Sequence, residues 1–500
     1  MAIVFVLVAL LVLAVIVTAN WYVWRRLFRD TTRGPGLTRR AGGVLIAGGW
    51  VLAIAALVAE RSGAPFWLQQ TLAWPGFLWL ALSIYLLLAV VAGEVVRPLL
   101  RRFLEHRDRA RAEAGPGPTA SPADRPHTPD APGGATGSAP AAAAQAGPHG
   151  GSAAAAPAAD PQGGVGAAAP GMAAAAAAQA GLRGGASGAT APATEPHPLT
   201  DPTPDAPEAT PQPLAPTGTT PAAPTGPSRR LFVSRIVAGA AAAAAVGTVG
   251  YGTYGVLRGP KVKRVTVPLA KLPRAAHGFR IAVVSDVHLG PVLGRGFAQT
   301  VVDTINATQP DLIAVVGDLV DGSVKDLGPA AAPLAGLRAR HGSYFVTGNH
   351  EYFSGAEQWV EEVRSLGINP LENARRELPY FDLAGVNDLA GEEEGQGPDF
   401  ARALGDRDTA RACVLLAHQP VQIHDAVEHG VDLQLSGHTH GGQLWPGNLI
   451  ASAANPTLAG LERYGDTQLY VSRGAGAWGP PTRVGAPSDI TLIELASKRA

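Results

Sequence analysis

The sequence predicts an α/β domain at the C-terminal end of the chain, preceded by transmembrane helices and a disordered linker. Three observations predict this organisation. Long apolar runs dominate the first part of the chain, a stretch of Ala, Pro, Gly and Thr follows, and from residue 262 short apolar runs alternate with helical patterns. Alternating strands and helices are typical of an α/β domain, in which ligands bind at the carboxyl ends of the strands. A chain of 500 residues has room for more than one domain.

Charge and cysteine content exclude some classes of function. Lys and Arg together number 40, as do Asp and Glu, so the net charge is zero and we expect no nucleic-acid partner. Cys413 is the only cysteine, which excludes an intrachain disulfide and a cysteine-based zinc site. Folding without disulfides fits the cytoplasm and is compatible with export.

Residues 1–105 are predicted to form a membrane region with three transmembrane helices, at 3–21, 44–58 and 72–96. The first run is long enough to cross a bilayer, and arginines follow the first and third runs. Because cytoplasmic flanks are enriched in Lys and Arg, we expect the N-terminus outside and these arginines in the cytoplasm. A transporter or channel is disfavoured, since we expect no ionisable side chain inside the spans.

Residues 106–227 are predicted to be a disordered linker, because they have almost no large apolar side chain with which to form a core. Residues 228–258 begin Ser-Arg-Arg-Leu-Phe and continue as an Ala-rich apolar segment. Two interpretations stay open: a twin-arginine export signal, which would make the twin-arginine machinery a partner, or a fourth transmembrane helix. Both place residues 262–500 outside. Three spans with an external N-terminus leave the linker inside, and the next crossing brings the chain out.

Residues 262–500 have a size suited to one domain. Short apolar runs predict its strands, and amphipathic patterns predict its helices. Ser354 and Glu357 predict a capping box at the start of one helix, and Gly367 predicts its end. The predicted strands are 279–284, 312–316, 344–347, 380–385, 414–417, 433–436, 469–472 and 490–494, and the predicted helices are 295–308, 355–366 and 420–428.

Five motifs rich in Asp, His and Asn follow five of these strands. Any one alone would more often be a turn or a satisfied core residue, but five in succession predict one shared metal site. Carboxylate, amide and imidazole ligands suit Mn, Fe, Zn or Ni better than Ca. One carboxylate can bridge two ions, which together can hold a hydroxide and clamp a phosphate. The motifs are Asp286-Xaa-His288, Gly317-Asp318-Xaa-Xaa-Asp321, Gly348-Asn349-His350-Glu351, His418 and His438-Xaa-His440.

The order and spacing of these motifs resemble the calcineurin-like metallophosphoesterase superfamily over residues 275–497. The segments SDVHLG, GHTHGGQ and YVSRGAG resemble its membrane-associated bacterial branch. The resemblance implies a two-sheet β-sandwich flanked by helices, with two divalent metal ions. It implies that Asp318 is catalytic and bridges the ions, and that the catalytic His350 lies beside the substrate phosphate, oriented by Glu351. For Asp321 two interpretations stay open, support of its loop or binding of metal, and we favour the first. The other implied ligands are Asp286, His288 and His440 for the first ion, and Asn349, His418 and His438 for the second.

These observations together predict a membrane-anchored phosphohydrolase with an extracytoplasmic catalytic domain. It would cleave a phosphomonoester or a phosphodiester by attack of a metal-bridging hydroxide, and the anchor favours a phospholipid or cell-envelope substrate. The alternative is a metal-binding sensor or scaffold without turnover, which would need a damaged motif. We expect Gln443 and Arg473 to line the substrate pocket. Three interpretations stay open for Trp445 and Trp478: they form an apolar rim of the substrate pocket, they point toward the lipid, or they pack against the rest of the domain.

Overall fold

The computed structural model describes residues 2–113 and 228–498. Most of the expected linker, residues 114–227, therefore lies outside the described residues. The first residues assigned to the linker are helical, because the third long helix continues to Glu113.

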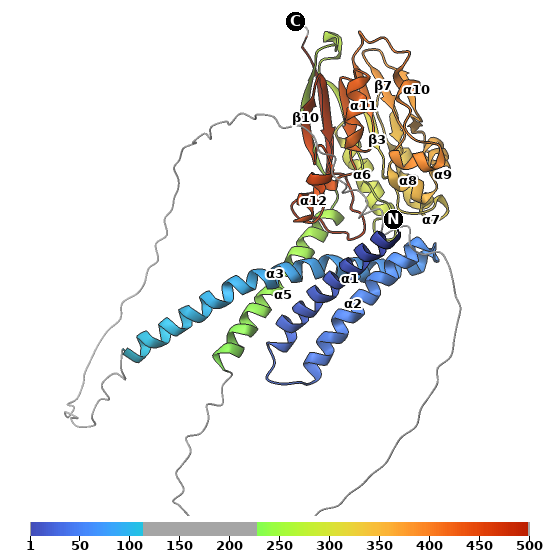
Figure 1. Ribbon diagram of the computed structural model, residues 1–500. Helices are drawn as coiled ribbons and strands as arrows, with labels where there is room; N and C mark the ends of the chain where they lie inside the picture. The colour runs from blue at the N-terminus through green and yellow to red at the C-terminus, as the bar shows by residue number, and fades with distance from the viewer. Residues whose placement is uncertain (1, 114–227, 499–500) are drawn as a thin grey trace, which may run out of the picture. The chain divides into compact units, whose positions relative to one another are not determined.

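Four of the described helices are long and apolar enough to cross a membrane. Each is longer than the apolar run that predicted it, because the helix continues into flanking polar residues. The expectation of spans without ionisable side chains is wrong for Glu94, which pairs with Arg26 at 2.8 Å and with Arg97 at 3.3 Å. The helices are α1 (Ala2–Trp24), continued by η1 (Arg25–Arg29), α2 (Leu37–Arg61), α3 (Phe66–Glu113) and α5 (Arg229–Leu257) (Figure 1).

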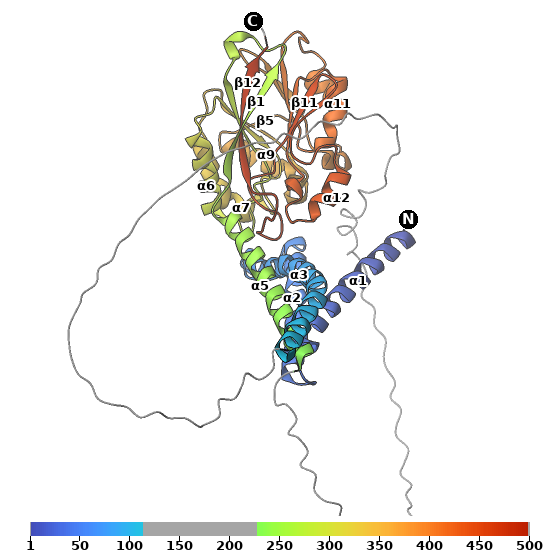
Figure 2. The ribbon, with the colours of Figure 1, turned by 90° about the vertical axis from the view of Figure 1, so that its left-hand side faces the viewer.

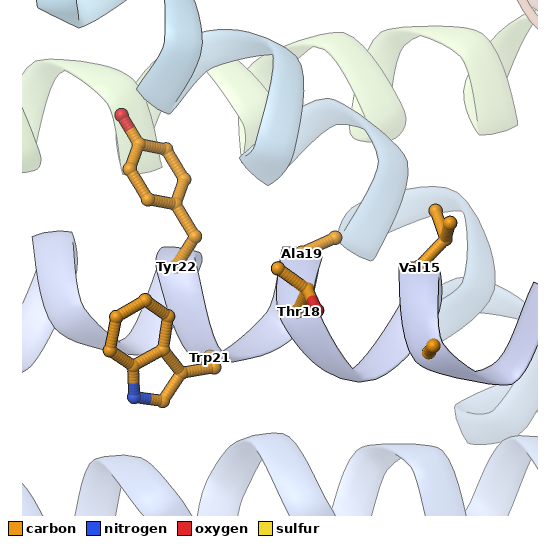
Figure 3. Close-up of a pocket in the computed structure, with 6 residues that line it drawn as sticks. Val15, Thr18, Ala19, Trp21 and Tyr22 are labelled. Carbon is orange, nitrogen blue, oxygen red and sulfur yellow. The ribbon is translucent and has the colours of Figure 1, made fainter. Parts of the chain in front are cut away.

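Small residues allow close packing among these helices. A side chain at Gly49 would meet the ring of Trp79, and one at Gly76 would meet the carbonyl oxygen of Leu52. Such small-residue contacts are typical of helices that pack in a membrane. Figure 3 shows the residues that line a hollow along α1; they are apolar except for the hydroxyls of Thr18 and Tyr22 and the indole nitrogen of Trp21, so the lining has no carboxylate or imidazole.

Residues 261–497 form two six-stranded sheets, which confirms the predicted two-sheet fold. In the first sheet β2 to β5 are parallel, and in the second β7, β8, β9 and β11 are parallel. The first sheet has the order β1 (Lys261–Leu269), β12 (Asp489–Ser497), β2 (Phe279–Val284), β3 (Leu312–Val316), β4 (Ser343–Val346), β5 (Asn369–Pro370). The second has the order β10 (Gly460–Tyr464), β11 (Thr467–Val471), β9 (Leu433–Ser436), β8 (Cys413–Leu416), β7 (Asp382–Gly385), β6 (Ala374–Glu377).

The main core lies between the sheets, where Ile281 and Val283 of the first sheet share a cluster with Val414 and Leu435 of the second. Helices cover both outer faces, and Figure 2 shows α6 and α11 on opposite sides of the pair of sheets. Because both faces of the central strands are buried, those strands are continuous apolar runs. The outer helices are α6 (Arg295–Ala307), α7 (Val324–Ala331) and α9 (Ala356–Ser365) over the first sheet, and α10 (Phe400–Leu404) and α11 (Ile423–Glu428) over the second.

Two local predictions differ from the structure. The N-cap of α9 is Gly355, with φ of 95°, so Ser354 and Glu357 form no capping box. Four strands, β1, β5, β6 and β10, were not predicted, because each has a partly exposed burial pattern. The remaining short helices are η2 (Arg274–Ala276), η3 (Ala332–Gly336), α8 (Asn349–Ser354), η4 (Leu389–Glu394), η5 (Pro420–Gln422), η6 (His440–Gly442) and α12 (Gly447–Ala454).

Candidate metal centre

The five sequence motifs lie at the carboxyl ends of five parallel strands. β2 leads to Asp286, β3 to Asp318, β4 to Asn349, β8 to His418 and β9 to His438. The ligand atoms of these motifs fall into groups that could each hold a metal ion. The structure therefore brings the side chains from all five motifs into one region.

The first group consists of Asp286, His288, Asp318 and His440, all buried. The Nε2 atoms of His288 and His440 lie 3.0 Å apart. His440 Nε2 is also 3.3 Å from Oδ1 of Asp286, and His288 Nε2 is 3.8 Å from Oδ2 of Asp318. Two imidazole nitrogens and two carboxylates thus face a common centre.

The second group consists of Asp318, His418 and His438, so Asp318 belongs to both of these groups; a third group, His288, Asp321 and His350, shares His288 with the first. His418 Nε2 lies 3.1 Å from Oδ2 of Asp318. Asn349 joins this group, because its Oδ1 is 3.0 Å from Nδ1 of His438. The shared carboxylate is the arrangement that a pair of neighbouring cations needs.

The hydrogen bonds of His418 fit metal binding. Its Nδ1 donates to the carbonyl oxygen of Val316 at 2.9 Å, which leaves Nε2 without a proton in the neutral ring. Nε2 is buried and has no hydrogen-bond partner among the described residues, since its approach to Asp318 has no hydrogen-bond geometry. A buried acceptor of this kind calls for a cation.

Backbone conformation at the site is strained. Asp286, His288, Asp318, His438 and His440 all have φ between 48° and 71°, a region that side chains other than Gly rarely adopt. Such strain is found where the surrounding fold imposes it, often at functional sites. Here it points the side chains of five expected ligands toward one another.

Glycines crowd the two carboxylates. A Cβ atom at Gly437 would meet Oδ2 of Asp286, and one at Gly348 would meet Oδ1 of Asp318. Gly474, with φ of 82°, would place its Cβ 2.5 Å from Cβ of Asp286. These positions accept only Gly because the backbone must pass so close to the ligands.

The site shifts the pKa values of the Asp286 and Asp318 carboxylates in opposite directions. Burial, together with the neighbouring Asp318, raises the pKa of Asp286. Burial opposes ionisation of Asp318 as well, but the nearby imidazoles of His418 and His350 hold its pKa well below the usual value. Bound cations would offset the cost of keeping both carboxylates ionised in one buried site.

His350 contacts Asp321 rather than the neighbouring residue predicted to orient it. Its Nδ1 lies 2.7 Å from Oδ1 of Asp321, which is also 2.8 Å from Nδ1 of His288. Although burial opposes the charge, the carboxylates of Asp318 and Asp321 raise the pKa of His350 to about 9. Asp321 thus links a predicted metal ligand to the predicted catalytic residue.

The prediction that Glu351 orients His350 is wrong. Its carboxylate accepts backbone N–H groups from Gly348 at 2.7 Å, Leu319 at 2.8 Å and Asp318 at 2.9 Å. Burial raises the pKa of Glu351 to about 7. The Glu351 side chain therefore connects the loop after β3 to the start of α8. It is longer than Asp by one methylene group, which allows its carboxylate to reach the backbone of that loop.

Two further side chains hold the site together. Arg483, which the sequence analysis missed, is 6% exposed; its Nη1 donates to the carbonyl oxygen of His440 at 3.0 Å, and Nη2 lies 3.0 Å from Nδ1 of that ring. Gln443 was expected in the substrate pocket, but its amide donates to the carbonyl oxygen of Trp478 at 2.9 Å and so fixes that loop. The Trp478 ring lies 5.6 Å from that of His350.

Comparisons with known proteins agree with this geometry. The family described as calcineurin-like phosphoesterase matches residues 279–442. A transmembrane protein with metallophosphoesterase domain from Danio rerio is 39% identical over 49% of this chain and 59% of its own length, so the chain spans little more than half of that relative. An uncharacterized metallophosphoesterase from Helicobacter pylori is 37% identical over 54% of this chain and 74% of its own. Another from Aquifex aeolicus is 34% identical over 48% of this chain and 92% of its own.

Proposed function

Because the chain belongs to the calcineurin-like metallophosphoesterase family, we propose that it is a membrane-anchored phosphohydrolase that uses two divalent metal ions to cleave a phosphomonoester or a phosphodiester. The observation that carries this proposal is the position of Asp318, whose carboxylate belongs to two of the three groups of candidate ligands. Mixed oxygen and nitrogen ligands suit Mn, Fe, Zn or Ni.

Each side chain has a defined task in this proposal. Asp286, His288 and His440 would hold one ion. Asn349, His418 and His438 would hold the other, with Asp318 between the two. When bound, such a pair supplies an activated water and neutralises the charge of the phosphate.

His350 is the residue we assign to proton transfer. Its side chain is 12% exposed, which gives a substrate access to the ring. Its Nδ1 is engaged by Asp321, so the proton on Nε2 is the one available to the leaving oxygen. The carboxylates of Asp318 and Asp321 raise the pKa of the ring, which favours the protonated form that a general acid needs.

A lipid-linked substrate is supported by the apolar side chains around His350. Phe353 and Trp478 are 54% and 43% exposed, and both rings lie 5.6 Å from that of His350. The end of α2 reaches the same place, because the guanidinium of Arg61 lies 5.9 Å from the ring of Phe353. A substrate held in the bilayer could thus present its phosphate to His350 while its apolar part stays near the membrane.

These contacts also support an extracytoplasmic location. Arg61 is the last residue of α2, and its contact with Phe353 supports a position of the catalytic domain on the same side of the membrane as the turn at 62–65, which we expect to be outside. The last turns of α5 join the same domain, since Val256 is part of its core and Thr253 Oγ1 lies 2.7 Å from Thr482 Oγ1. A reporter fused to the C-terminus should be active only outside the cytoplasm, and cytoplasmic activity would overturn this orientation.

Two routes could deliver the domain across the membrane. In the structure Arg229 and Arg230 open α5, whose N-cap Ser228 accepts from the backbone N–H of Leu231 at 3.4 Å. We favour an uncleaved fourth span, with the twin-arginine machinery as the second route. Replacing Arg229 and Arg230 by Lys distinguishes the two routes. Loss of the external domain supports the twin-arginine route, and normal insertion supports ordinary membrane integration.

The experiment that tests the function uses the full chain in detergent, each candidate metal in turn and a panel of phosphomonoesters and phosphodiesters. We expect metal-dependent turnover that Asp318→Asn reduces by several orders of magnitude. The surface variant Asp303→Asn is the matched control and should retain full activity, since the exposed Asp303 accepts a hydrogen bond from its neighbour Gln299 on α6, at 2.9 Å. Metal binding without turnover on any substrate would instead favour the sensor.

A further inference from the structure

A cavity of about 340 Å³ lies between the ends of three of the long helices, far along the chain from the metal centre. Its walls come from η1 with the residue after it, from α3 and from the first turns of α5. The lining residues are Arg26 and Asp30; Glu94, Arg97 and Arg101; and Arg230 with Ser234. None of these residues takes part in the proposed catalytic chemistry.

The lining carries more positive than negative charge. Four arginines face two carboxylates, and the carboxylates are already shared within the cluster. Arg26 pairs with Asp30 at 2.9 Å and with Glu94 at 2.8 Å, and Arg97 pairs with Glu94 at 3.3 Å. No ion pair is found for Arg101 or Arg230 among the described residues, which leaves a formal excess of two positive charges.

Some donors in this cluster lack acceptors. The Nε atoms of Arg26 and Arg97 are buried and have no hydrogen-bond partner among the described residues, and the same holds for Oε1 of Glu94. Arg97 as a whole is only 7% exposed. A buried donor without a partner is costly, so these groups call for an anion with several acceptor oxygens.

The cavity lies where lipid headgroups would be. Arg26 and Arg97 follow the apolar runs 3–21 and 72–96, and Arg230 precedes the apolar part of α5, although α3 itself continues to Glu113. The structure therefore gathers the flanks that the sequence assigns to the cytoplasm. Arg235 connects two of these ends directly, since its Nε donates to the carbonyl oxygen of Thr31 at 3.0 Å. Basic pockets between transmembrane helices at this level bind anionic headgroups.

We propose that this cavity binds a phosphate group, supplied by an anionic phospholipid of the cytoplasmic leaflet. The planar guanidinium groups of Arg97, Arg101 and Arg230 match phosphate oxygens in geometry and charge. The bound lipid joins α1, α3 and α5 at their cytoplasmic ends. Arg230 then has a role inside the folded helix bundle, separate from any role in export.

The test measures binding to the full chain in detergent by native mass spectrometry, with a chelator present so that the metal centre binds no phosphate. The probes are dihexanoyl phosphatidylglycerol, dihexanoyl phosphatidylcholine, glycerol phosphate and inorganic phosphate. The variant Arg101→Gln/Arg230→Gln removes the unpaired charges of the cavity. The matched control Arg33→Gln/Arg229→Gln removes the same charge from nearby positions that do not line it.

We expect the chain to bind phosphatidylglycerol in preference to phosphatidylcholine. The cavity variant should bind it about thirty-fold more weakly, since each of the two arginines contributes roughly fivefold. The control should bind as the natural sequence does. Equal binding of glycerol phosphate or inorganic phosphate would assign the site to a soluble anion. Equal weakening in both double variants, or no preference for any anion, would overturn the proposal.

Discussion

Replacing Asp321 by Asn tests how the site controls proton transfer. The substitution keeps the size of the side chain but removes the charge that lies 2.7 Å from Nδ1 of His350 and 2.8 Å from Nδ1 of His288. His350 would keep its place in the loop and lose one of the carboxylates that raise its pKa.

The expected magnitude follows from the structure. Asp318, Asp321 and Glu351 together raise the pKa of His350 from 6.5 to about 9 against the opposing effect of burial, a difference of roughly 3 kcal/mol. Loss of one carboxylate should therefore lower the pKa by about one or more. Because the protonated His350 ring is the acid, activity should decline with rising pH, and in the variant this decline should begin at a lower pH than in the unsubstituted chain. Loss of orientation should reduce kcat by a further factor of about 10–100.

The assay compares pH profiles of kcat for an ester with a good leaving group, such as p-nitrophenol, and for an alkyl ester with a poor one. A good leaving group needs little protonation, so the Asp321→Asn variant should lose much less activity on the p-nitrophenyl ester. Asp303→Asn should change neither profile. If kcat falls equally on both esters, and the pH at which activity declines on the alkaline side does not change, Asp321 is not a positioning residue for His350.

Three other predictions concern packing around the site. Gly437→Ala should abolish tight metal binding, because the added methyl group would meet Oδ2 of Asp286; metal titration measures this. Glu351→Ala should destabilise the domain by about 3 kcal/mol or more, measured by thermal unfolding, because three buried N–H groups lose their acceptor. Cys413 should resist alkylation at neutral pH until the domain unfolds, because burial raises the pKa of its thiol to about 12.

Matched changes elsewhere serve as controls for these predictions. Gly296→Ala adds the same methyl group at an exposed position of α6, where the new Cβ would have no other atom within 4 Å. This variant should bind metal normally. Glu361→Ala removes a carboxylate that is 74% exposed and should change stability little. Reaction of Cys413 in the folded chain as fast as in the unfolded chain would contradict its place in the core.

The strands that carry the site could be predicted because they are buried on both faces. The runs 279–284, 312–316 and 433–436 agree with β2, β3 and β9 residue for residue. β1 could not be predicted in the same way. It is an edge strand whose Lys261, Lys263 and Arg264 break the apolar pattern, and it is recognised only by its pairing with β12.

The candidate ligands could be predicted for a related reason, since each follows such a strand directly. The groups that support them could not. Asp321 and Glu351 exchange their expected tasks because loop geometry, and not distance along the chain, decides which carboxylate reaches His350. Arg483 lies in a Pro- and Gly-rich loop with no motif, and only the folded chain brings its guanidinium to His440.

Metal content of the purified full chain tests the central claim most directly. Elemental analysis after saturation with Mn²⁺ or Zn²⁺ and removal of excess ion should find two ions per chain in the natural sequence. His440→Ala and His418→Ala, which each remove a ligand from one group only, should leave about one ion. A single ion in the natural sequence, or two ions in both variants, would contradict a centre shared through Asp318.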